Sequence, residues 1–210
     1  QDYDVILTTA SLSLRLAMIA PRLKAATIGW QHNCYDGYLH VKPVVFWQQE
    51  NLLQQYLPNL DRYIVLSDYD KRDYMEKLGI DCEVKINPRS FVSEKKCDVK
   101  SKRFLMATRF VYAKGLDLMM ESFEEFCKED SEWELDIIGD GDLFDQIRAD
   151  AKKRHLEKRV HFVGYTNEPE KYYLNSSVFL LPSRWEGWPM VIMEAFEFGL
   201  PVIAYHMGAM

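Results

Sequence analysis

Short apolar runs alternate with segments of helical period along most of the chain. We expect each run to be a strand that is buried on both faces, as in a parallel sheet. Strands that alternate with helices in this way are typical of a doubly wound α/β fold. The predicted strands cover residues 5–7, 26–28, 63–66, 84–86, 104–107, 135–138, 160–163, 178–181 and 202–204.

One segment between these strands has an especially clear helical period. Its apolar side chains recur every three or four residues and glutamates take the other face, so we expect a helix whose apolar stripe packs in the core. Helix ends are marked as well: Ser67 and Asp70 have the spacing of a capping box, and Gly79 and Gly199 are placed to end helices. The apolar stripe consists of Leu116, Met119, Met120, Phe123, Phe126 and Cys127.

The alternation breaks between residues 88 and 102, where the chain is polar and has no period. Such a stretch is typical of a linker. We therefore predict two α/β domains with a cleft between them: a first domain over residues 1–88, a linker over 89–101 and a second domain over 102–210. The chain begins and stops close to predicted strands, so we expect both domains to be incomplete, because parallel sheets need both faces covered.

Composition narrows the class of protein. The 210 residues are 48% hydrophobic and 13% aromatic, which favours a globular protein with a sizeable core. A net charge of -6 argues against a general nucleic-acid binder, because that needs a basic face. The four cysteines lack C-x-x-C spacing, so the sequence favours a reducing cytoplasm. No apolar run approaches the roughly 20 residues of a membrane-spanning helix.

Two glutamates bracket a turn near the carboxyl end of the chain. Glu186 follows the predicted strand 178–181, and Glu194 lies inside the helix that Pro189 is suited to begin. The loop between strand and helix is where doubly wound sheets bind ligands, and free N–H groups at a helix start favour phosphate. Glu194 would then reach the hydroxyls of a ribose.

The simpler interpretation is that these glutamates are solvated charges around a helix cap. Against it, the helix after Pro189 is apolar, so we expect it to be largely buried and its glutamate to need a partner. The stretch 182–204 also closely resembles the E-x7-E signature of retaining glycosyltransferases with the GT-B fold, glycosyltransferase family 4. That resemblance implies that Glu194 binds the nucleotide ribose. It implies contacts with donor sugar and phosphate for Glu186 and for the backbone of Gly187, Trp188, Pro189 and Met190.

A second motif resembles the same family. Residues 108–115 follow the predicted strand 104–107 and resemble its Gly-Arg-x4-Lys-Gly pattern, which implies that Arg109 and Lys114 bind the donor diphosphate. A departing diphosphate gains negative charge, and an enzyme without a metal must offset it with fixed cations. Taken alone, both residues would be ordinary surface charges. Thr108 stands where the family has glycine, which puts a close approach of this loop to the phosphates in doubt.

Other segments carry weaker resemblances. Gly164 and Tyr165 match the strand end that lies against the base in the family, and His32 matches a histidine that faces the donor sugar, although a single histidine is more often structural. Asp140-Gly-Asp142 could be mistaken for a D-x-D metal site. We favour a turn that opens a helix, with acidic residues near its positive end. Magnesium dependence would count against that interpretation.

Together the motifs predict an enzyme that moves a sugar from a nucleoside diphosphate donor to an acceptor hydroxyl with retention, without a cofactor or an obligatory metal. The residues expected to act in catalysis are Glu186, His32, Arg109 and Lys114. Glycan or lipid-linked acceptors in polysaccharide, lipopolysaccharide or glycolipid synthesis suit a cytoplasmic protein, with peripheral contact at the inner face of the membrane as an option. One alternative is a truncated or inactive nucleotide-binding module. A weaker one is a GT-B epimerase or phosphorylase.

Overall fold

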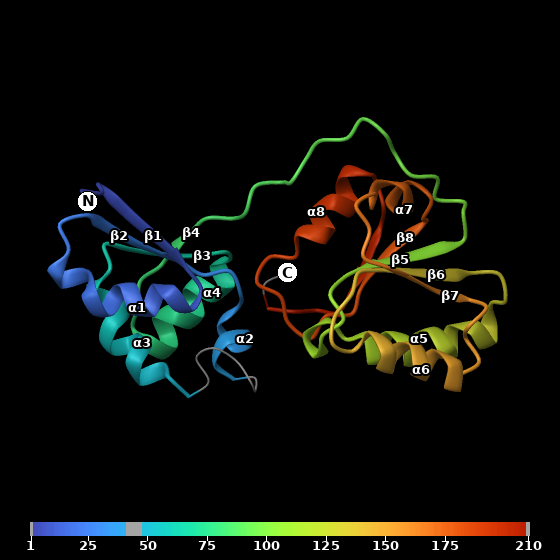
Figure 1. The fold of residues 1–210 in the computed structure, drawn as a ribbon, viewed down its shortest axis with the longest axis horizontal. Helices are drawn as coiled ribbons and strands as arrows, with labels where there is room; N and C mark the ends of the chain where they lie inside the picture. Colours follow the sequence, from blue (N-terminus) through green and yellow to red (C-terminus); the bar gives the residue numbers. More distant parts are fainter. Residues whose placement is uncertain (1, 41–47, 209–210) are drawn as a thin grey trace. The chain divides into compact units, whose positions relative to one another are not determined.

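The computed structural model describes residues 2–40 and 48–208, and the chain divides into two compact units. The first unit comprises residues 1–88 together with 185–188 and 207–210, and the second comprises residues 89–184 and 189–206. Each unit is built on its own parallel sheet, and Figure 1 labels most of the strands and helices of both.

The first unit has a four-stranded parallel sheet in the order β1-β2-β3-β4. Helices α1 and α3 lie on one side of it (Figure 1). Its strands are β1 (Val5–Thr9), β2 (Ala26–Trp30), β3 (Arg62–Val65) and β4 (Glu83–Val84). Its helices are α1 (Ser11–Ile19), α2 (Tyr35–Leu39), α3 (Glu50–Tyr56) and α4 (Asp68–Asp73), with 3-10 turns at Ala20–Arg22 and Leu57–Asn59 and a π-helical turn at Tyr74–Leu78.

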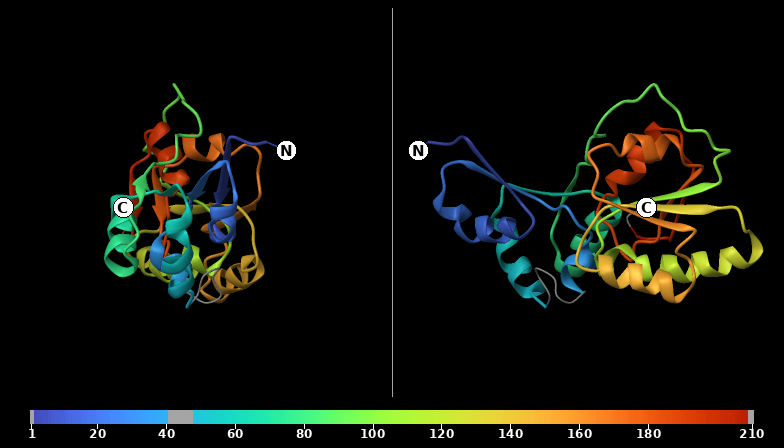
Figure 2. Two further views of the ribbon diagram at one scale, coloured as in Figure 1. Left: turned by 90° about the vertical axis from the view of Figure 1, so that its left-hand side faces the viewer. Right: turned by 45° about the vertical axis from the view of Figure 1, so that its right-hand side comes forward.

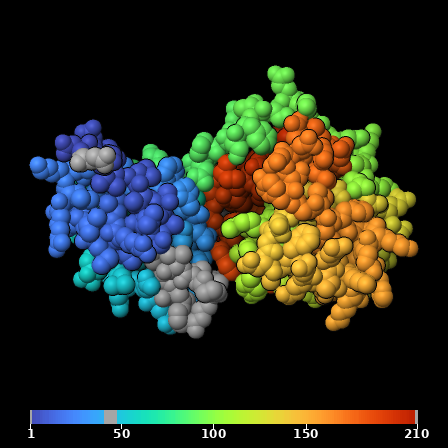
Figure 3. Space-filling view, in the orientation of Figure 1, coloured from blue at the N-terminus to red at the C-terminus, as the bar shows by residue number. Residues whose placement is uncertain are grey.

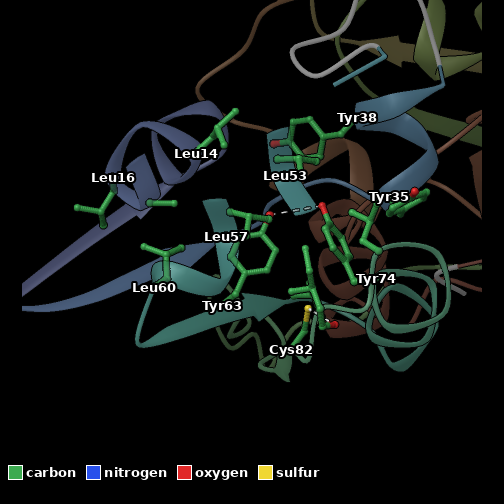
Figure 4. Close-up of a cluster of buried hydrophobic side chains, with 14 of the residues drawn as sticks. Leu14, Leu16, Tyr35, Tyr38, Leu53, Leu57, Leu60, Tyr63, Tyr74 and Cys82 are labelled. Atoms are coloured by element: carbon green, nitrogen blue, oxygen red, sulfur yellow. Dashed lines mark hydrogen bonds between the residues drawn. The ribbon is translucent and has the colours of Figure 1, made fainter. Parts of the chain in front are cut away.

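A group of tyrosines crosses the core of the first unit (Figure 4). The Tyr63 hydroxyl donates to the Tyr74 hydroxyl at 3.4 Å, and the Tyr74 hydroxyl accepts from Nε2 of Gln31 at 3.1 Å. Buried hydroxyls need such partners, because an unmade hydrogen bond in the core is costly. The bond to Gln31 ties the segment that follows β2 to the core.

The second unit has a five-stranded parallel sheet in the order β7-β6-β5-β8-β9. Helices α5 and α6 lie on one side of the sheet and α7 and α8 on the other (Figures 1 and 2). Its strands are β5 (Arg103–Ala107), β6 (Glu134–Ile138), β7 (Val160–Gly164), β8 (Val178–Leu181) and β9 (Val202–Ala204). Its helices are α5 (Leu116–Glu129), α6 (Phe144–Lys153), α7 (Glu170–Leu174) and α8 (Met190–Glu197), with a 3-10 turn at Tyr112–Lys114.

The predicted α/β fold with parallel sheets is confirmed, and a strand is present at each of the nine predicted places. The expectation that all of them are buried on both faces is wrong for β1, for β9 and for the predicted strand 84–86. Val5 is 53% exposed, Ile203 is 60% exposed and Ile86 is 57% exposed. Strands β1, β4 and β9 lie at the edge of their sheets, where a side chain has a neighbouring strand on one side only.

Most predicted helix signals are confirmed. The stripe of α5 packs in the core, the Ser67 hydroxyl accepts from the Asp70 backbone N–H at 3.0 Å, and Gly79 and Gly199 end helices with φ of 68° and 74°. The expectation that the helix after Pro189 is largely buried is wrong. Ala195 is the buried residue of α8, and Phe196 on the same helix is 58% exposed. Pro189 itself precedes the helix, which begins at Met190.

The predicted linker has no regular secondary structure, but it is bound to the second unit. Arg89 donates to Oε1 of Glu197 at 2.8 Å, and the backbone N–H of Cys97 donates to the carbonyl of Phe198, also at 2.8 Å. Lys95 donates to Glu170 at 2.7 Å. These contacts anchor the segment to α7 and to the carboxyl end of α8. The predicted domain limits at residues 88 and 102 stay a prediction.

Candidate functional site

The loops after β5, β6 and β7 meet at the carboxyl edge of the sheet in the second unit. The backbone N–H of Thr108 donates to the carbonyl of Ile138 at 2.9 Å, and that of Gly139 donates to the carbonyl of Gly164 at 2.9 Å. At Gly139 a Cβ atom would lie 1.8 Å from the carbonyl oxygen of Thr108, so only glycine fits there. The fold therefore brings together the ends of β5 and β7, which carry predicted site residues, with the end of β6 between them.

The loop after β5 also packs against the stretch that follows β8. Gly115 has a φ of 64°, and a Cβ atom there would lie 2.0 Å from the carbonyl oxygen of Pro182. Only glycine combines that backbone conformation with so close an approach. The loop is anchored further by Phe110, which is fully buried, while Arg109 beside it is exposed. The two motifs that the sequence analysis singled out are thus in direct contact.

Arg184 joins the two motifs with its backbone and its side chain. Its backbone N–H donates to the carbonyl of Ala113 at 2.8 Å, and its guanidinium donates to the carbonyl of Tyr112 at 2.9 Å. The guanidinium also forms a two-pronged ion pair with Asp117, with distances of 2.8 and 2.6 Å to Oδ1 and Oδ2. The hydrogen bonds from Arg184 lower the pKa of the Asp117 carboxyl. We did not predict this pair from the sequence.

Glu194, on α8, has a buried partner on α7. The Tyr173 hydroxyl donates to Oε2 of Glu194 at 2.8 Å. Burial, and then the charge of Glu194, raise the pKa of Tyr173, so its hydroxyl keeps the proton that it donates. Tyr173 binds one carboxylate oxygen of Glu194 and not the other. Glu194 also forms part of the wall of a cavity of about 970 Å³. The other lining residues are Phe91, Val92, Ser93, Glu94, Lys95, Asn167, Glu168, Pro169, Glu170, Lys171, Tyr173, Leu174 and Phe198.

The loop after β7 is open by comparison. Gly164 has a φ of 77°, but no atom lies within 4 Å of the place where its Cβ would be. Tyr165 is 79% exposed. The following segment around residues 165–175, orange in Figure 3, lies on the surface of the second unit. A flat aromatic ring here has room to contact a planar ligand.

Of the remaining predicted site residues, His32, Glu186, Gly187 and Trp188 belong to the first unit, and Pro189 and Met190 belong to the second. His32 lies two residues after β2 with its ring centroid 5.2 Å from that of Trp30, and partial burial lowers the pKa of the imidazole. In the same unit a Cβ atom on Gly187 would lie 2.7 Å from the carbonyl oxygen of His32. Glu186 is buried. The structure therefore places the backbone beside Glu186 close to that of His32, and the roles of both residues stay predictions.

Asp140 and Asp142 lie in the turn before α6, as expected. The Asp140 carboxylate accepts from the backbone N–H of Gly141 at 2.7 Å. Over residues 2–40 and 48–208, no group of three or more His, Cys, Asp or Glu side chains is placed to hold a metal ion. In the same ranges, no helix is both long and apolar enough to cross a membrane.

Comparison with known proteins adds to this geometry. The sequence profile described as Glycosyl transferases group 1 matches residues 90–210, which include the loop after β5, the loop after β7 and the stretch 182–204. The chain belongs to the glycosyl transferases group 1 family. That match covers the two motifs and the candidate residues of the second unit.

Relatives and solved structures agree with this family. An uncharacterized glycosyltransferase of Haemophilus influenzae is 30% identical over 148 residues, which are 70% of this chain and 42% of the relative. The lipopolysaccharide 1,6-galactosyltransferase of Salmonella typhimurium is 31% identical over 105 residues, which are 48% of this chain and 29% of the relative. The structure of S. aureus TarM with fondaparinux, alpha-GlcNAc-glycerol and UDP has a TM-score of 0.82 at 20% identity, over 96% of this chain and 41% of that chain.

The chain therefore spans less than half the length of each of these proteins. The TarM similarity shows that its fold is part of the GT-B fold.

Proposed function

We propose that this group 1 chain forms the donor-binding part of a retaining glycosyltransferase of glycosyltransferase family 4. The observation that carries the proposal is the close packing of Gly115 against the Pro182 carbonyl, whose oxygen would lie 2.0 Å from any Cβ atom at position 115. It joins the loop of Arg109 and Lys114 to the stretch that leads into α8. Two cations and a helix start near the same strand ends form a setting suited to a diphosphate.

In the proposed reaction the bond from the anomeric carbon to the diphosphate breaks, and a bond from that carbon to the acceptor oxygen forms on the same face of the sugar. The acceptor hydroxyl loses its proton, which ends on the departing diphosphate or in water. Arg109 and Lys114 offset the negative charge of the leaving group, which makes a metal ion dispensable. Glu194 accepts hydrogen bonds from the ribose, and Glu186 and His32 position the sugar. Neither glutamate serves as a proton-transfer base.

We further propose that the donor is a UDP-sugar and that the acceptor is a glycan or a lipid-linked glycan. The TarM structure contains UDP, and the Salmonella relative is named a lipopolysaccharide 1,6-galactosyltransferase. Gly164 and Tyr165 would lie against the base. A place at the cytoplasmic face of the membrane belongs to this proposal too.

A panel of donors tests the reaction. The intact protein is incubated with UDP-glucose, UDP-galactose, UDP-GlcNAc, GDP-mannose and ADP-glucose, with and without glycan or lipid-linked acceptors, and the released nucleoside diphosphate is measured. We expect turnover of a UDP-sugar that EDTA does not abolish, and a product with the anomeric configuration of the donor by NMR. An inverted product would refute retention. Absence of turnover with every donor and acceptor would favour the alternative, a binding module without catalysis.

A further inference from the structure

One residue from the stretch after β8 holds two residues of the loop before α5 and one residue in the first turn of that helix. Arg184 binds the carbonyl of Tyr112 with its side chain, the carbonyl of Ala113 with its backbone N–H, and the carboxylate of Asp117 with both prongs of its guanidinium. The guanidinium also lies over the Tyr112 ring, 4.0 Å from its centroid. We call the ion pair between Arg184 and Asp117 the clamp.

Lys114 lies in the sequence between these anchors. Tyr112 and Ala113 precede it, and Asp117 follows it in the first turn of α5. A planar guanidinium that binds a carboxylate with two parallel bonds fixes orientation as well as distance. The side chain of Arg184 is largely buried, which limits its own freedom. The clamp therefore restricts where the backbone that carries Lys114 can lie.

We propose that the clamp is a positioning device that sets the 112–117 backbone so that Lys114 and the neighbouring Arg109 meet the diphosphate of the donor. This inference rests on the proposed function. Arg184 and Asp117 are positioning residues, because they act through the loop and do not touch the donor. Their effect should fall on recognition of the diphosphate and not on recognition of the nucleoside.

Comparing diphosphate binding with nucleoside binding tests the proposal, because a general loss of structure would weaken both. Asp117→Asn removes the charge of one partner at nearly constant size, and Arg184→Lys keeps the cation but removes the two-pronged geometry. UDP affinity is measured by calorimetry and uridine binding by saturation-transfer NMR, both on the intact protein. We expect UDP binding to weaken about five- to twentyfold in each variant, below the hundredfold that a 1 Å misplacement can cost a reacting group. Uridine binding should not change.

Glu125→Gln is the matched control. Glu125 lies on the same helix as Asp117 and forms an exposed ion pair with Lys128 at 2.6 Å, so the variant makes the same change of charge away from the loop. It should bind UDP like the unaltered protein. All three variants should keep the melting temperature within about 4 °C, since the Glu125 pair is exposed and the half-exposed Asp117 carboxylate limits the contribution of the clamp to about 1 kcal/mol.

Three results would overturn the inference, and each has a different meaning. If the unaltered protein binds UDP and the two clamp variants bind it as well as the Glu125→Gln control, the clamp does not position the loop and the proposed function stands. If uridine and UDP affinities fall together, Arg184 and Asp117 have a general structural role instead. If the unaltered protein binds neither UDP nor another nucleoside diphosphate, the proposed function fails and the inference fails with it.

Discussion

Two loops at the carboxyl edge of the same sheet are built in opposite ways. Both contain a glycine with positive φ, 64° at Gly115 and 77° at Gly164. Gly115 packs against Pro182, and Arg184 binds the carbonyl of Tyr112 before Lys114 and the carboxylate of Asp117 after it. Gly164 has open space where its Cβ would be, and exposed Tyr165 follows it. A shared backbone requirement therefore does not imply a shared environment.

The difference matches the proposed ligand. A diphosphate is recognised through its negative charge, so a loop that holds its cations in place binds it at little entropic cost. A base can be contacted by an exposed aromatic ring on an open loop. We interpret the loop after β5 as preorganised and the loop after β7 as adaptable.

The largest predicted effect comes from adding one methyl group to each loop. Gly115→Ala would place Cβ 2.0 Å from the carbonyl oxygen of Pro182 and also force alanine into positive φ. We expect a loss of unfolding free energy above about 3 kcal/mol, or failure to fold. Gly164→Ala carries only the φ strain, so its loss should be about 1–2 kcal/mol. Urea unfolding of the two variants measures both values, and equal losses would refute the comparison.

A smaller effect is expected at Glu194. Tyr173→Phe removes the hydroxyl that donates to Glu194 and keeps the ring, which stacks on Phe179 and Phe198. A hydrogen bond to a charged group contributes about 1.5–3 kcal/mol, of which solvent replaces a part, so we expect UDP affinity to fall about three- to tenfold. Tyr172→Phe, next to it on α7, should leave UDP affinity unchanged. Equal calorimetric affinities of the two variants would show that Tyr173 does not orient Glu194.

The smallest predicted effect is the loss, at low pH, of the contribution of the clamp to the unfolding free energy. The pKa of Asp117 is lowered in the folded protein, so the clamp stabilises the fold above the unfolded pKa of about 3.9 and loses this contribution as pH falls through the lowered value. Because Asp117 is half exposed, the contribution at pH 7 should be no more than about 1 kcal/mol. Urea unfolding should therefore separate Asp117→Asn from the unaltered protein at pH 7 and not in strong acid.

The open loop supplies the control for this pH experiment. Glu168 forms an exposed ion pair with Lys171 at 3.3 Å in the segment after β7. Glu168→Gln should change the unfolding free energy less than Asp117→Asn at pH 7. A difference between Asp117→Asn and the unaltered protein that persists unchanged in strong acid would contradict the assignment to the charge of Asp117.

Much of the fold could be predicted from the sequence, because burial in a parallel sheet leaves apolar runs that are visible one strand at a time. The runs do not reveal which strands lie at an edge, and this is why the exposure of Val5 and Ile203 was missed. Nor does the apolar character of α8 reveal that Phe196 faces solvent. Edge position depends on strand order, which is a property of the whole sheet.

The sequence predicted the motifs of the candidate site but not the residues that hold those motifs in place. Resemblance pointed to Arg109, Lys114 and Glu194, whose roles stay predictions. Tyr173 lies 21 residues before Glu194, and Asp117 lies 67 residues before Arg184. No periodicity or capping rule links residues at such separations, so only the packed structure pairs them. The anchoring of the polar segment 89–97 by Glu197 and Phe198 was missed for the same reason.

The central claim is that the loop after β5 and helix α8 together bind the donor nucleotide. Calorimetric titration of UDP into the intact protein and the variants Arg109→Ala and Glu194→Ala tests it most directly, with exposed Arg148→Ala and Glu121→Ala as controls of matched charge. We predict that each site variant weakens UDP binding about ten- to a hundredfold, as expected for loss of charge-assisted hydrogen bonds, and that both controls bind like the unaltered protein. Unchanged UDP affinity in both site variants would contradict the account.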